Sequence, residues 1–397
     1  MTATTNGASA LDNSSLKNEA SHLSNGTLKV NNWSHPGPAA YDFRSDITTT
    51  PTTRMLSAIA STTLLDDVFQ EDPTTTNLES FIAELTGKEA ALLVLSGTMG
   101  NQVAIRTHLL APPHSLVCDW RSHIVQYEAG GVGSLTGAMM ITLDPKNGKY
   151  LTLEDIKSRA VISGDVHACP TKLISLENTL NGVILPLAEC RRISAWAREN
   201  RIIMHLDGAR LWEAVAAGAG TMKEYAECFD SMSLCFSKGL GAPIGSIIVG
   251  TQAFRERARW IRKSIGGGLR QAGVVTAAAR VAVEDTFLGG ILTACHERAR
   301  EIAGIWQDLG GKVTHPVETN MVWVDLDAAG ISTDEFVKLG EREGLRLGGG
   351  RLVIHYQIGE EAVQKLKNVM QAVFKGKQTN GTADDHSEKL QQLEPVR

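Results

Sequence analysis

Short apolar segments alternate with amphipathic helical patterns through much of the chain. The segment "TNLESFIAELTGKEAALLVLSG" predicts a helix followed by a strand that ends at Gly97. The helical "EDIKSRAV" precedes the strand "TKLISLEN", and the amphipathic "LAECRRISAWAREN" precedes the strand "RIIMHLDGA". Because helices that separate successive strands return the chain to the same edge of a sheet, this pattern predicts an α/β fold with a largely parallel sheet.

The pattern changes after about residue 286, where helices and strands form a shorter α+β arrangement. We therefore predict a large domain with an N-terminal arm over residues 39–285 and a small C-terminal domain over residues 286–375. Residues 1–38 are rich in Ser, Thr, Asn and Gly, and residues 376–397 are similarly poor in apolar side chains. We expect both of these tails to be disordered.

Composition argues against several classes of protein. The net charge is −5 and no long basic stretch occurs, so we expect no nucleic-acid surface. No apolar run reaches the length of a membrane span, and the N-terminus lacks the hydrophobic core of a secretory signal. The six cysteines are scattered without a Cys-x-x-Cys pair, which is typical of reduced thiols. We expect a cytoplasmic protein without a metal site.

Lys238 occupies a Ser-Lys-Gly turn between two apolar runs, Met232–Phe236 and Ile244–Val249. A single lysine after a strand is usually solvated. Two buried strands would instead hold this turn in place, and desolvation favours the neutral amine that attacks a carbonyl group. The setting therefore indicates Schiff-base chemistry.

A glycine-rich turn, "SGTMGNQ" (Ser96–Gln102), lies at a predicted strand-to-helix junction. Small residues at such a junction allow backbone N–H groups and the positive end of the helix to bind a phosphate. Turns of this kind are also common packing devices. Alone, the motif indicates phosphate binding no more strongly than packing.

Asp207 and Arg210, in "HLDGARLWEA", directly follow an apolar strand, where open α/β sheets bind their ligands. A carboxylate at this position can pair with a protonated ring nitrogen, as in pyridoxal-phosphate sites. The alternative is a structural Asp–Arg pair that closes a turn. The glycine-rich turn, the strand-end aspartate and Lys238 together are far more specific than any one of them.

His123 and Tyr127, in "DWRSHIVQYEAGG", are four residues apart and would share one face of a helix. An imidazole above a conjugated ring can stack on it and relay a proton. A lone histidine is more often a surface or core residue. His167, in "GDVHACPT", carries the same ambiguity.

Together these segments resemble the threonine aldolase family of pyridoxal-phosphate enzymes, which have the aspartate-aminotransferase fold (fold type I). The resemblance runs from "YDFRSD" (Tyr41–Asp46) to "GGRLVIHYQI" (Gly349–Ile358) and is nearest to the fungal-like branch. It includes "EDPTTTNLE", "RSHIVQYEAGG", "LISLENT", "HLDGARLWEA" and "FSKGLGAPIGS" in the family's order.

The resemblance implies pyridoxal 5′-phosphate as the cofactor, with Lys238 as the lysine that forms a Schiff base with it. Asp207 would keep the pyridine nitrogen protonated, and Arg210 would lie beside the phenolic oxygen. The remaining cofactor contacts that it implies come from Gly97, Thr98, His123 and Arg270, the last reaching the phosphate from a neighbouring subunit.

The resemblance also implies an amino-acid substrate. Ser45 and Arg351 would hold the substrate carboxylate, with Arg351 as a bidentate fork, and Tyr127 would line the substrate site. His123 and His167 would contact the β-hydroxyl group, whose proton an aldolase must remove to break the Cα–Cβ bond. Relatives are dimers or tetramers, so we expect a homodimer or homotetramer with active sites between subunits.

One loop departs from the family pattern. Leu65 and Gln70 stand where glycines are usual, and Phe69 replaces a frequent tyrosine. Side chains added there should narrow the loop or change its contacts. The loop therefore leaves the substrate and the reaction open.

The reaction expected from the family is cleavage of L-threonine and L-allo-threonine to glycine and acetaldehyde through a quinonoid carbanion. The alternative is an alanine racemase that supplies D-alanine to a fungal nonribosomal peptide pathway, because it would use the same carbanion. His123 and His167 favour the aldolase, since alanine has no hydroxyl group. A lyase acting on cysteine-like substrates and a non-catalytic scaffold are further alternatives.

Overall fold

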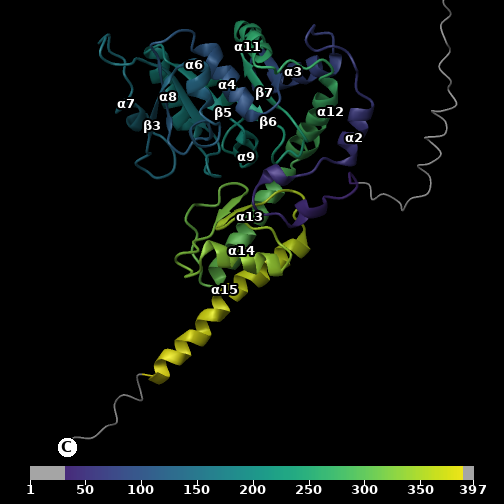
Figure 1. Cartoon of the computed structure of the whole chain (residues 1–397), viewed down its shortest axis with the longest axis vertical. Helices are drawn as coiled ribbons and strands as arrows, with labels where there is room; N and C mark the ends of the chain where they lie inside the picture. The colour runs from purple at the N-terminus through teal and green to yellow at the C-terminus, as the bar shows by residue number, and fades with distance from the viewer. Residues whose placement is uncertain (1–31, 388–397) are drawn as a thin grey trace, which may run out of the picture.

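In the computed structural model, residues 32–387 are described, with side chains described through residue 375. Residues 1–31 and 388–397, which belong to the two predicted tails, lie outside the described residues. Helix α15 (Glu360–Ser387) continues past residue 376, where we expected the second tail to begin (Figure 1). No helix in the described range is long and apolar enough to cross a membrane.

Within the described part of the chain, a seven-stranded sheet forms the centre of the large domain, with the strand order β1-β7-β6-β5-β4-β2-β3. Strand β7 is antiparallel to both of its neighbours, and the remaining neighbours pair in parallel. The prediction of an α/β fold with a largely parallel sheet is confirmed. The strands are β1 (Ala90–Val94), β2 (Ser115–Asp119), β3 (Met139–Leu143), β4 (Thr171–Glu177), β5 (Ile203–Asp207), β6 (Ser231–Cys235) and β7 (Ser246–Gly250).

Helices cover both faces of this sheet (Figure 1). Ala91 of β1 packs in the large apolar cluster that includes α3, α8, α10 and α12, whereas its neighbour Leu92 packs with α4 and α11. This division follows because successive side chains of a strand point to opposite faces. The large-domain helices are α2 (Thr53–Ala60), α3 (Pro73–Thr86), α4 (Gly97–His108), α5 (His123–Gln126), α6 (Gly131–Thr136), α7 (Leu153–Lys157), α8 (Leu187–Glu199), α9 (Leu211–Ala216), α10 (Met222–Glu227), α11 (Gln252–Ser264) and α12 (Gly273–Ala282).

The small domain has its own apolar core, which also takes in the N-terminal segment. Phe43 is buried in this core, and its backbone bonds to Arg346 at 3.0 Å and to Val353 at 2.8 Å. The N-terminal arm therefore joins the two domains. The remaining elements are the short helical segments η1 (Gly37–Tyr41), η2 (Asp46–Thr48) and η3 (Val283–Leu288), followed by α13 (Ile291–Asp308), β8 (Met321–Trp323), α14 (Thr333–Arg342) and β9 (Arg351–Val353).

Strand β1 lies at one edge of the sheet, and side chains satisfy its outward backbone groups. Glu79 accepts a hydrogen bond from the N–H of Leu93 at 2.9 Å. Arg262 donates to the carbonyl of Leu93 at 2.7 Å, and Arg255 donates to the carbonyl of Ala91 at 3.3 Å. These contacts protect an edge that could otherwise pair with another chain.

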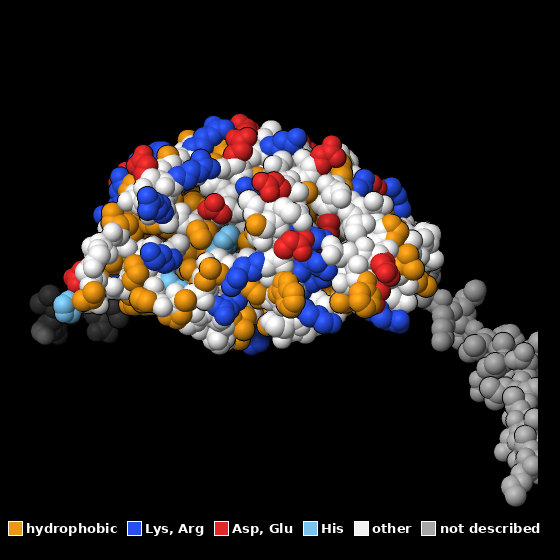
Figure 2. Space-filling model, turned by 90° about the horizontal axis from the view of Figure 1, so that it is seen from above, with side chains coloured by type: hydrophobic (Ala, Val, Ile, Leu, Met, Phe, Trp, Pro, Cys, Tyr) orange, Lys and Arg blue, Asp and Glu red, His pale blue; other side chains and the backbone are white. Residues whose placement is uncertain are grey.

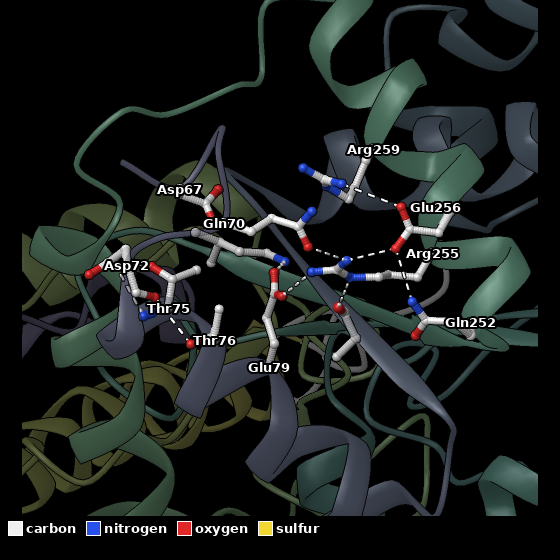
Figure 3. Close-up of polar contacts among 12 residues, drawn as sticks. Asp67, Gln70, Asp72, Thr75, Thr76, Glu79, Gln252, Arg255, Glu256 and Arg259 are labelled. Atoms are coloured by element: carbon white, nitrogen blue, oxygen red, sulfur yellow. Dashed lines mark hydrogen bonds and ion pairs between the residues drawn. The ribbon is translucent and has the colours of Figure 1, made fainter. Parts of the chain in front are cut away.

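The same two arginines hold the loop before α3. Arg262 pairs with Asp67 at 3.0 Å, and Arg255 donates to the side-chain oxygen of Gln70 at 2.8 Å. Figure 3 shows the Arg255 side chain reaching both Glu79 and Gln70. The loop that departs from the family pattern is therefore anchored to β1, the strand that leads into Gly97.

Candidate active site

Chemically active side chains gather at the carboxyl edge of the parallel strands. Glu177 is the last residue of β4 and Asp207 the last residue of β5, and the two are paired in the sheet. Lys238 lies in the turn after β6, which ends at Cys235. Open α/β sheets bind ligands at this edge, because the strand ends and the following helix starts meet there.

Asp207 is buried, and two hydrogen bonds fix the orientation of its carboxylate. Oδ2 accepts from the side-chain amide of Asn101 at 2.7 Å. Oδ1 accepts from the backbone N–H of Ala209 at 3.1 Å. A fixed, buried carboxylate at a strand end has the chemistry required to hold a cationic ring nitrogen.

Lys238 lies in a tightly held turn. Its carbonyl accepts hydrogen bonds from Thr49 Oγ1 at 2.8 Å and from the N–H of Gly241 at 2.9 Å. A Cβ at Gly239 would lie 2.6 Å from Glu213 Oε1, so the turn requires glycine. Among the described residues, the half-buried Lys238 ammonium makes no ion pair, which leaves the amine available for chemistry.

The start of α4 lies against β6. A Cβ at Gly97 would come within 2.7 Å of Cys235 Sγ, so only glycine permits this approach. Ser96 caps the helix by accepting from the N–H of Met99 at 3.1 Å. The N–H groups of Gly97 and Thr98 belong to the first turn and have no intrahelical acceptor, which suits them to bind an anion.

Arg210 forms an ion pair with Asp46 of η2. The alternative considered from the sequence, a structural pair in which Arg210 and Asp207 close a turn, is therefore not what the structure has. The Nε atom of Arg210 lies 2.8 Å from Asp46 Oδ2, and Nη2 contacts the other carboxylate oxygen. Burial would raise the pKa of Asp46, but the charge and hydrogen bonds of Arg210 outweigh it and lower this pKa to about 2. The pair links the N-terminal arm to the end of β5.

Arg351 is a cation without a carboxylate partner among the described residues. Its Nη2 donates to the carbonyl of Arg44 at 3.0 Å, one residue before the buried Ser45. Burial, together with the positive charge of Arg210, lowers the pKa of Arg351. A half-buried guanidinium beside a second cation favours the binding of an anion.

His123 and Tyr127 do lie together, with ring centroids 5.6 Å apart. His123 Nδ1 lies 2.9 Å from the Oε1 atom of the buried Glu128, and its backbone N–H donates to Glu177 at 2.8 Å. His123 is therefore held at two points, its ring by Glu128 and its backbone N–H by Glu177.

Two predicted site residues are not brought to this cluster. The side chain of His167 is 90% exposed and contacts Asp165. Arg270 is also exposed, and its carbonyl accepts from the N–H of Asp67 at 2.7 Å. The roles expected for both residues stay predictions.

The oxygen and nitrogen atoms of His123, Glu128 and Asp207 lie within 4.8 Å of one another, which is close enough to ligate a metal. However, the amide nitrogen of Asn101 donates to both carboxylates, at 2.8 Å and 2.7 Å. This N–H donor occupies the space between the two carboxylates that a cation would need. The arrangement therefore suits a hydrogen-bond network rather than a metal site.

A sequence profile of the beta-eliminating lyase family matches residues 42–329, a range that contains every residue of this cluster except Arg351. The chain belongs to the beta-eliminating lyase family. The prediction that it is a lyase related to the threonine aldolases is confirmed.

Curated relatives of this beta-eliminating lyase include both aldolases and a racemase. The chain is 61% identical to aldolase vrtJ of Penicillium aethiopicum over 87% of its own length and 89% of that protein. It is 46% identical to alanine racemase TOXG of Cochliobolus carbonum over 86% of its length and 90% of that protein. It is 44% identical to the low specificity L-threonine aldolase of Saccharomyces cerevisiae over 85% and 87%, respectively.

Solved structures share the fold of this lyase. The threonine aldolase of Leishmania major aligns with a TM-score of 0.71 at 20% identity, over 84% of this chain and 99% of that one. The serine palmitoyltransferase of Sphingomonas wittichii aligns with a TM-score of 0.65 at 16% identity, over 92% and 98% of the two chains. The prediction of the pyridoxal-phosphate fold type I is confirmed.

Sequence reasoning missed three buried or half-buried residues of the lyase site: Asn101, Glu128 and Glu177. Each falls inside a segment that we had quoted, "SGTMGNQ", "RSHIVQYEAGG" and "LISLENT". The available signal was a polar residue within or just after an apolar segment. No such signal distinguishes a buried network from a solvated side chain.

Proposed function

We propose that this lyase cleaves L-threonine and L-allo-threonine to glycine and acetaldehyde, with pyridoxal 5′-phosphate as its cofactor. The observation that carries the proposal is that Asp207 ends β5 and Lys238 follows the neighbouring strand β6, at one edge of the sheet. Arg351, which has no carboxylate partner among the described residues, lies close enough to Arg210 for that positive charge to lower its pKa. The identity of 44–46% with fungal low-specificity L-threonine aldolases supports this choice of substrate.

The residues present fit the cofactor in charge and chemistry. Lys238 would hold it covalently through its amine, and the buried Asp207 carboxylate would hold a proton on the ring nitrogen. Gly97 and Thr98 would bind the phosphate through their free N–H groups. When bound, pyridoxal phosphate supplies an electron sink that stabilises negative charge at the α-carbon of an amino acid.

The other site residues would act on the substrate. Arg351 and Ser45 would bind the carboxylate of the amino acid and so fix its orientation. His123 would accept the proton of the β-hydroxyl group, because Cα–Cβ cleavage turns that oxygen into the carbonyl of acetaldehyde. Tyr127, whose ring lies beside His123, would line the substrate site. His167 would assist at the hydroxyl group if its loop closed.

Alanine racemisation is the second candidate. The identity with the alanine racemase, 46%, equals that with the probable low-specificity L-threonine aldolase of Schizosaccharomyces pombe. The structure adds that Gln70, where the family resemblance leads us to expect glycine, adopts a left-handed conformation with φ 62°. The side chain of Gln70 is held there by a hydrogen bond from Arg255 at 2.8 Å, so the loop that departs from the expected family pattern is fixed in place.

We further infer a homo-oligomer, a dimer or a tetramer, in the cytoplasm. Phe69 and Trp260 are 74% and 81% exposed, and Trp260 lines a cavity of about 280 Å³ together with Val68. Figure 2 views the molecule from the side on which α11 lies in Figure 1, and hydrophobic side chains are scattered there among Lys and Arg side chains. Phe69 follows Val68, which lines the same cavity as Trp260, so these apolar side chains are grouped, and such a group favours burial against another subunit. Such a subunit would also be placed to supply Arg270.

A paired assay on the cofactor-loaded protein tests the proposal. One reaction supplies L-threonine or L-allo-threonine, and acetaldehyde and glycine are quantified. The other supplies L-alanine in deuterated water, and D-alanine and α-deuterium are followed by chiral chromatography and mass spectrometry. Aldehyde release with negligible D-alanine supports the aldolase, whereas rapid D-alanine formation with little aldehyde would assign the racemase.

A further inference from the structure

Asn101, buried in α4, connects the two halves of the site. Its Nδ2 donates to Glu128 Oε1 at 2.8 Å and to Asp207 Oδ2 at 2.7 Å, and its Oδ1 lies 3.1 Å from His205 Nε2. The opposite amide orientation would place Oδ1 between two carboxylates, where it could accept no hydrogen bond and would be repelled. The orientation of this amide is therefore determined by its neighbours.

The orientation of Asn101 also fixes the protons behind it. His205 must donate from Nε2, so its Nδ1 accepts from Ser231 Oγ, which lies 2.8 Å away. His108 Nε2 then donates to Ser231 Oγ at 2.8 Å. Burial, with the nearby His108 ring, lowers the pKa of His205 to about 3, so this histidine is neutral. In this series of hydrogen bonds, His108, Ser231 and His205 each donate to the next group in the direction of Asn101.

The network ends at His123. Glu128 Oε1 accepts from Asn101 and lies 2.9 Å from His123 Nδ1. The second oxygen, Oε2, is buried without a hydrogen-bond partner among the described residues. A carboxylate so constrained holds the imidazole proton on Nδ1 and leaves Nε2 as the ring's acceptor.

We propose that Asn101 and Glu128 are positioning residues that hold His123 in its Nδ1–H form, so that Nε2 accepts the proton of the substrate's β-hydroxyl group. This inference rests on the proposed aldolase function and deepens it. The Asn101 amide also donates to Asp207. One side chain therefore orients Asp207, which would hold the cofactor ring, and, through Glu128, His123, which would act on the substrate. Glu128 also stabilises the imidazolium that forms when His123 takes up the proton.

The charged groups around His123 set the sign of the expected effect. The hydrogen bond with Glu128 raises the pKa of His123, burial opposes it, Asp207 raises it and Lys238 lowers it. Glu177 contacts the residue through the backbone N–H. Removal of the Glu128 charge should therefore lower the pKa of His123.

Glu128→Gln is the sharpest test, because it keeps the side-chain shape and an oxygen acceptor but removes the charge. The pKa of His123 can be measured on the cofactor-free full chain from the exchange of its imidazole C2 hydrogen, followed by mass spectrometry across pH. We expect a lower pKa than in the wild type. We also expect kcat for threonine cleavage to fall about 10- to 100-fold, below the roughly 10²–10⁴-fold that a general base contributes.

Asn101→Ala provides a second, independent variant. Burial raises the pKa of Glu128, and the hydrogen bonds from His123 and Asn101 oppose that rise. Without the amide donor of Asn101, Glu128 therefore holds a proton more readily. A protonated Glu128 no longer stabilises the imidazolium, so the pKa of His123 should again fall. The acid limb of the kcat profile should move to lower pH in both variants.

Glu213→Gln is the matched control. Glu213 is also buried and lies 2.7 Å from the ring nitrogen of a buried histidine, His296. Its replacement should lower the melting temperature, because a buried hydrogen bond is weakened, but should not move the pKa of His123. A variant that only weakens the fold changes the melting temperature, whereas a variant that disturbs the positioning of His123 also changes the pKa of that histidine.

An unchanged His123 pKa in folded Glu128→Gln and Asn101→Ala proteins would overturn this inference. So would a shift of the same size in Glu213→Gln. The proposed function fails differently: wild-type protein would then release no acetaldehyde, even with the expected pKa shift in both variants. The two failures are distinguishable, because the hydrogen-exchange measurement requires neither cofactor nor substrate.

Discussion

Glu177 and Asp207 occupy paired positions at the ends of two neighbouring parallel strands, so two carboxylates meet at the edge of the sheet. Burial, together with the negative charge of Asp207, raises the pKa of Glu177 to about 8 from its ordinary 4.5. The Oε2 atom of Glu177 accepts a hydrogen bond from the backbone N–H of His123 at 2.8 Å.

This raised pKa predicts a pH-dependent stability. The folded state keeps a proton on Glu177 that the unfolded chain releases, so Glu177 stabilises the fold at low pH and this contribution is lost as the pH rises through about 8. Glu177→Gln should remove the loss and raise the melting temperature of the cofactor-free protein at pH 8.5 by about 1–2 °C, the shift for ~1 kcal/mol in a chain of this size. At pH 5 the two proteins should melt alike, and an equal difference at both pH values would contradict the assignment.

Because the backbone at Gln70 is left-handed, we predict that two small substitutions there differ in stability. Gln70→Gly relieves the strain of a non-glycine residue at φ 62°, whereas Gln70→Ala keeps the strain, and both lose the hydrogen bond to Arg255. The glycine variant should be more stable than the alanine variant by about 1 kcal/mol in urea unfolding. Equal stabilities would show that the loop carries no such strain.

The same glycine variant tests the loop's part in specificity. We expect Gln70→Gly to change the ratio of kcat/KM for threonine to that for alanine, because the side chain and its link to α11 are removed. Cofactor affinity should not change. An unaltered ratio would show that the departure at this loop is irrelevant to the substrate.

We predict that a conservative substitution of Arg351 weakens substrate binding and leaves cofactor binding unchanged. Arg351→Lys keeps the positive charge but removes the planar fork that binds a carboxylate through two bonds. Loss of a charge-assisted hydrogen bond costs about 1.5–3 kcal/mol, so KM for threonine should rise about 10- to 100-fold. The cofactor's absorbance should stay as in the wild type, and a lysine variant with unchanged KM would place the carboxylate elsewhere.

The exposed side chains near β1 predict an assembly defect. Phe69→Asp combined with Trp260→Asp should lower the mass measured by light scattering, because charges would have to be buried between subunits. Met139→Asp is the control, since Met139 is also exposed but lies on β3, at the opposite edge of the sheet. An unchanged mass in the double variant would exclude this surface from the interface.

The fold followed from the sequence because short apolar runs bounded by turn residues alternate with longer amphipathic helical patterns. The apolar strands around Lys238 and before Asp207 are the observed β5, β6 and β7, and each is nearly or fully buried. Both residues were identified from their position after such a strand. Local patterns therefore located the strand-end part of the site.

The remaining part of the candidate site depends on contacts between residues far apart in the sequence, and no local sequence pattern indicates such contacts. Arg210 pairs with Asp46, 164 residues away, and its partner could not be read from the turn that contains it. Asn101 lies on α4, where a polar side chain most often faces solvent. Its buried position between two carboxylates follows from how α4 packs on β5 and β6.

The central claim is that Lys238 is the residue that binds the cofactor, and covalent trapping tests it most directly. The cofactor-loaded protein is reduced with borohydride and digested, and the modified lysine is located by mass spectrometry, with Lys238→Ala and the exposed Lys146→Ala as paired variants. We predict the pyridoxyl mass on Lys238 in the wild type and in Lys146→Ala, and no modified lysine in Lys238→Ala. Modification of another lysine, or an active Lys238→Ala protein, would contradict the claim.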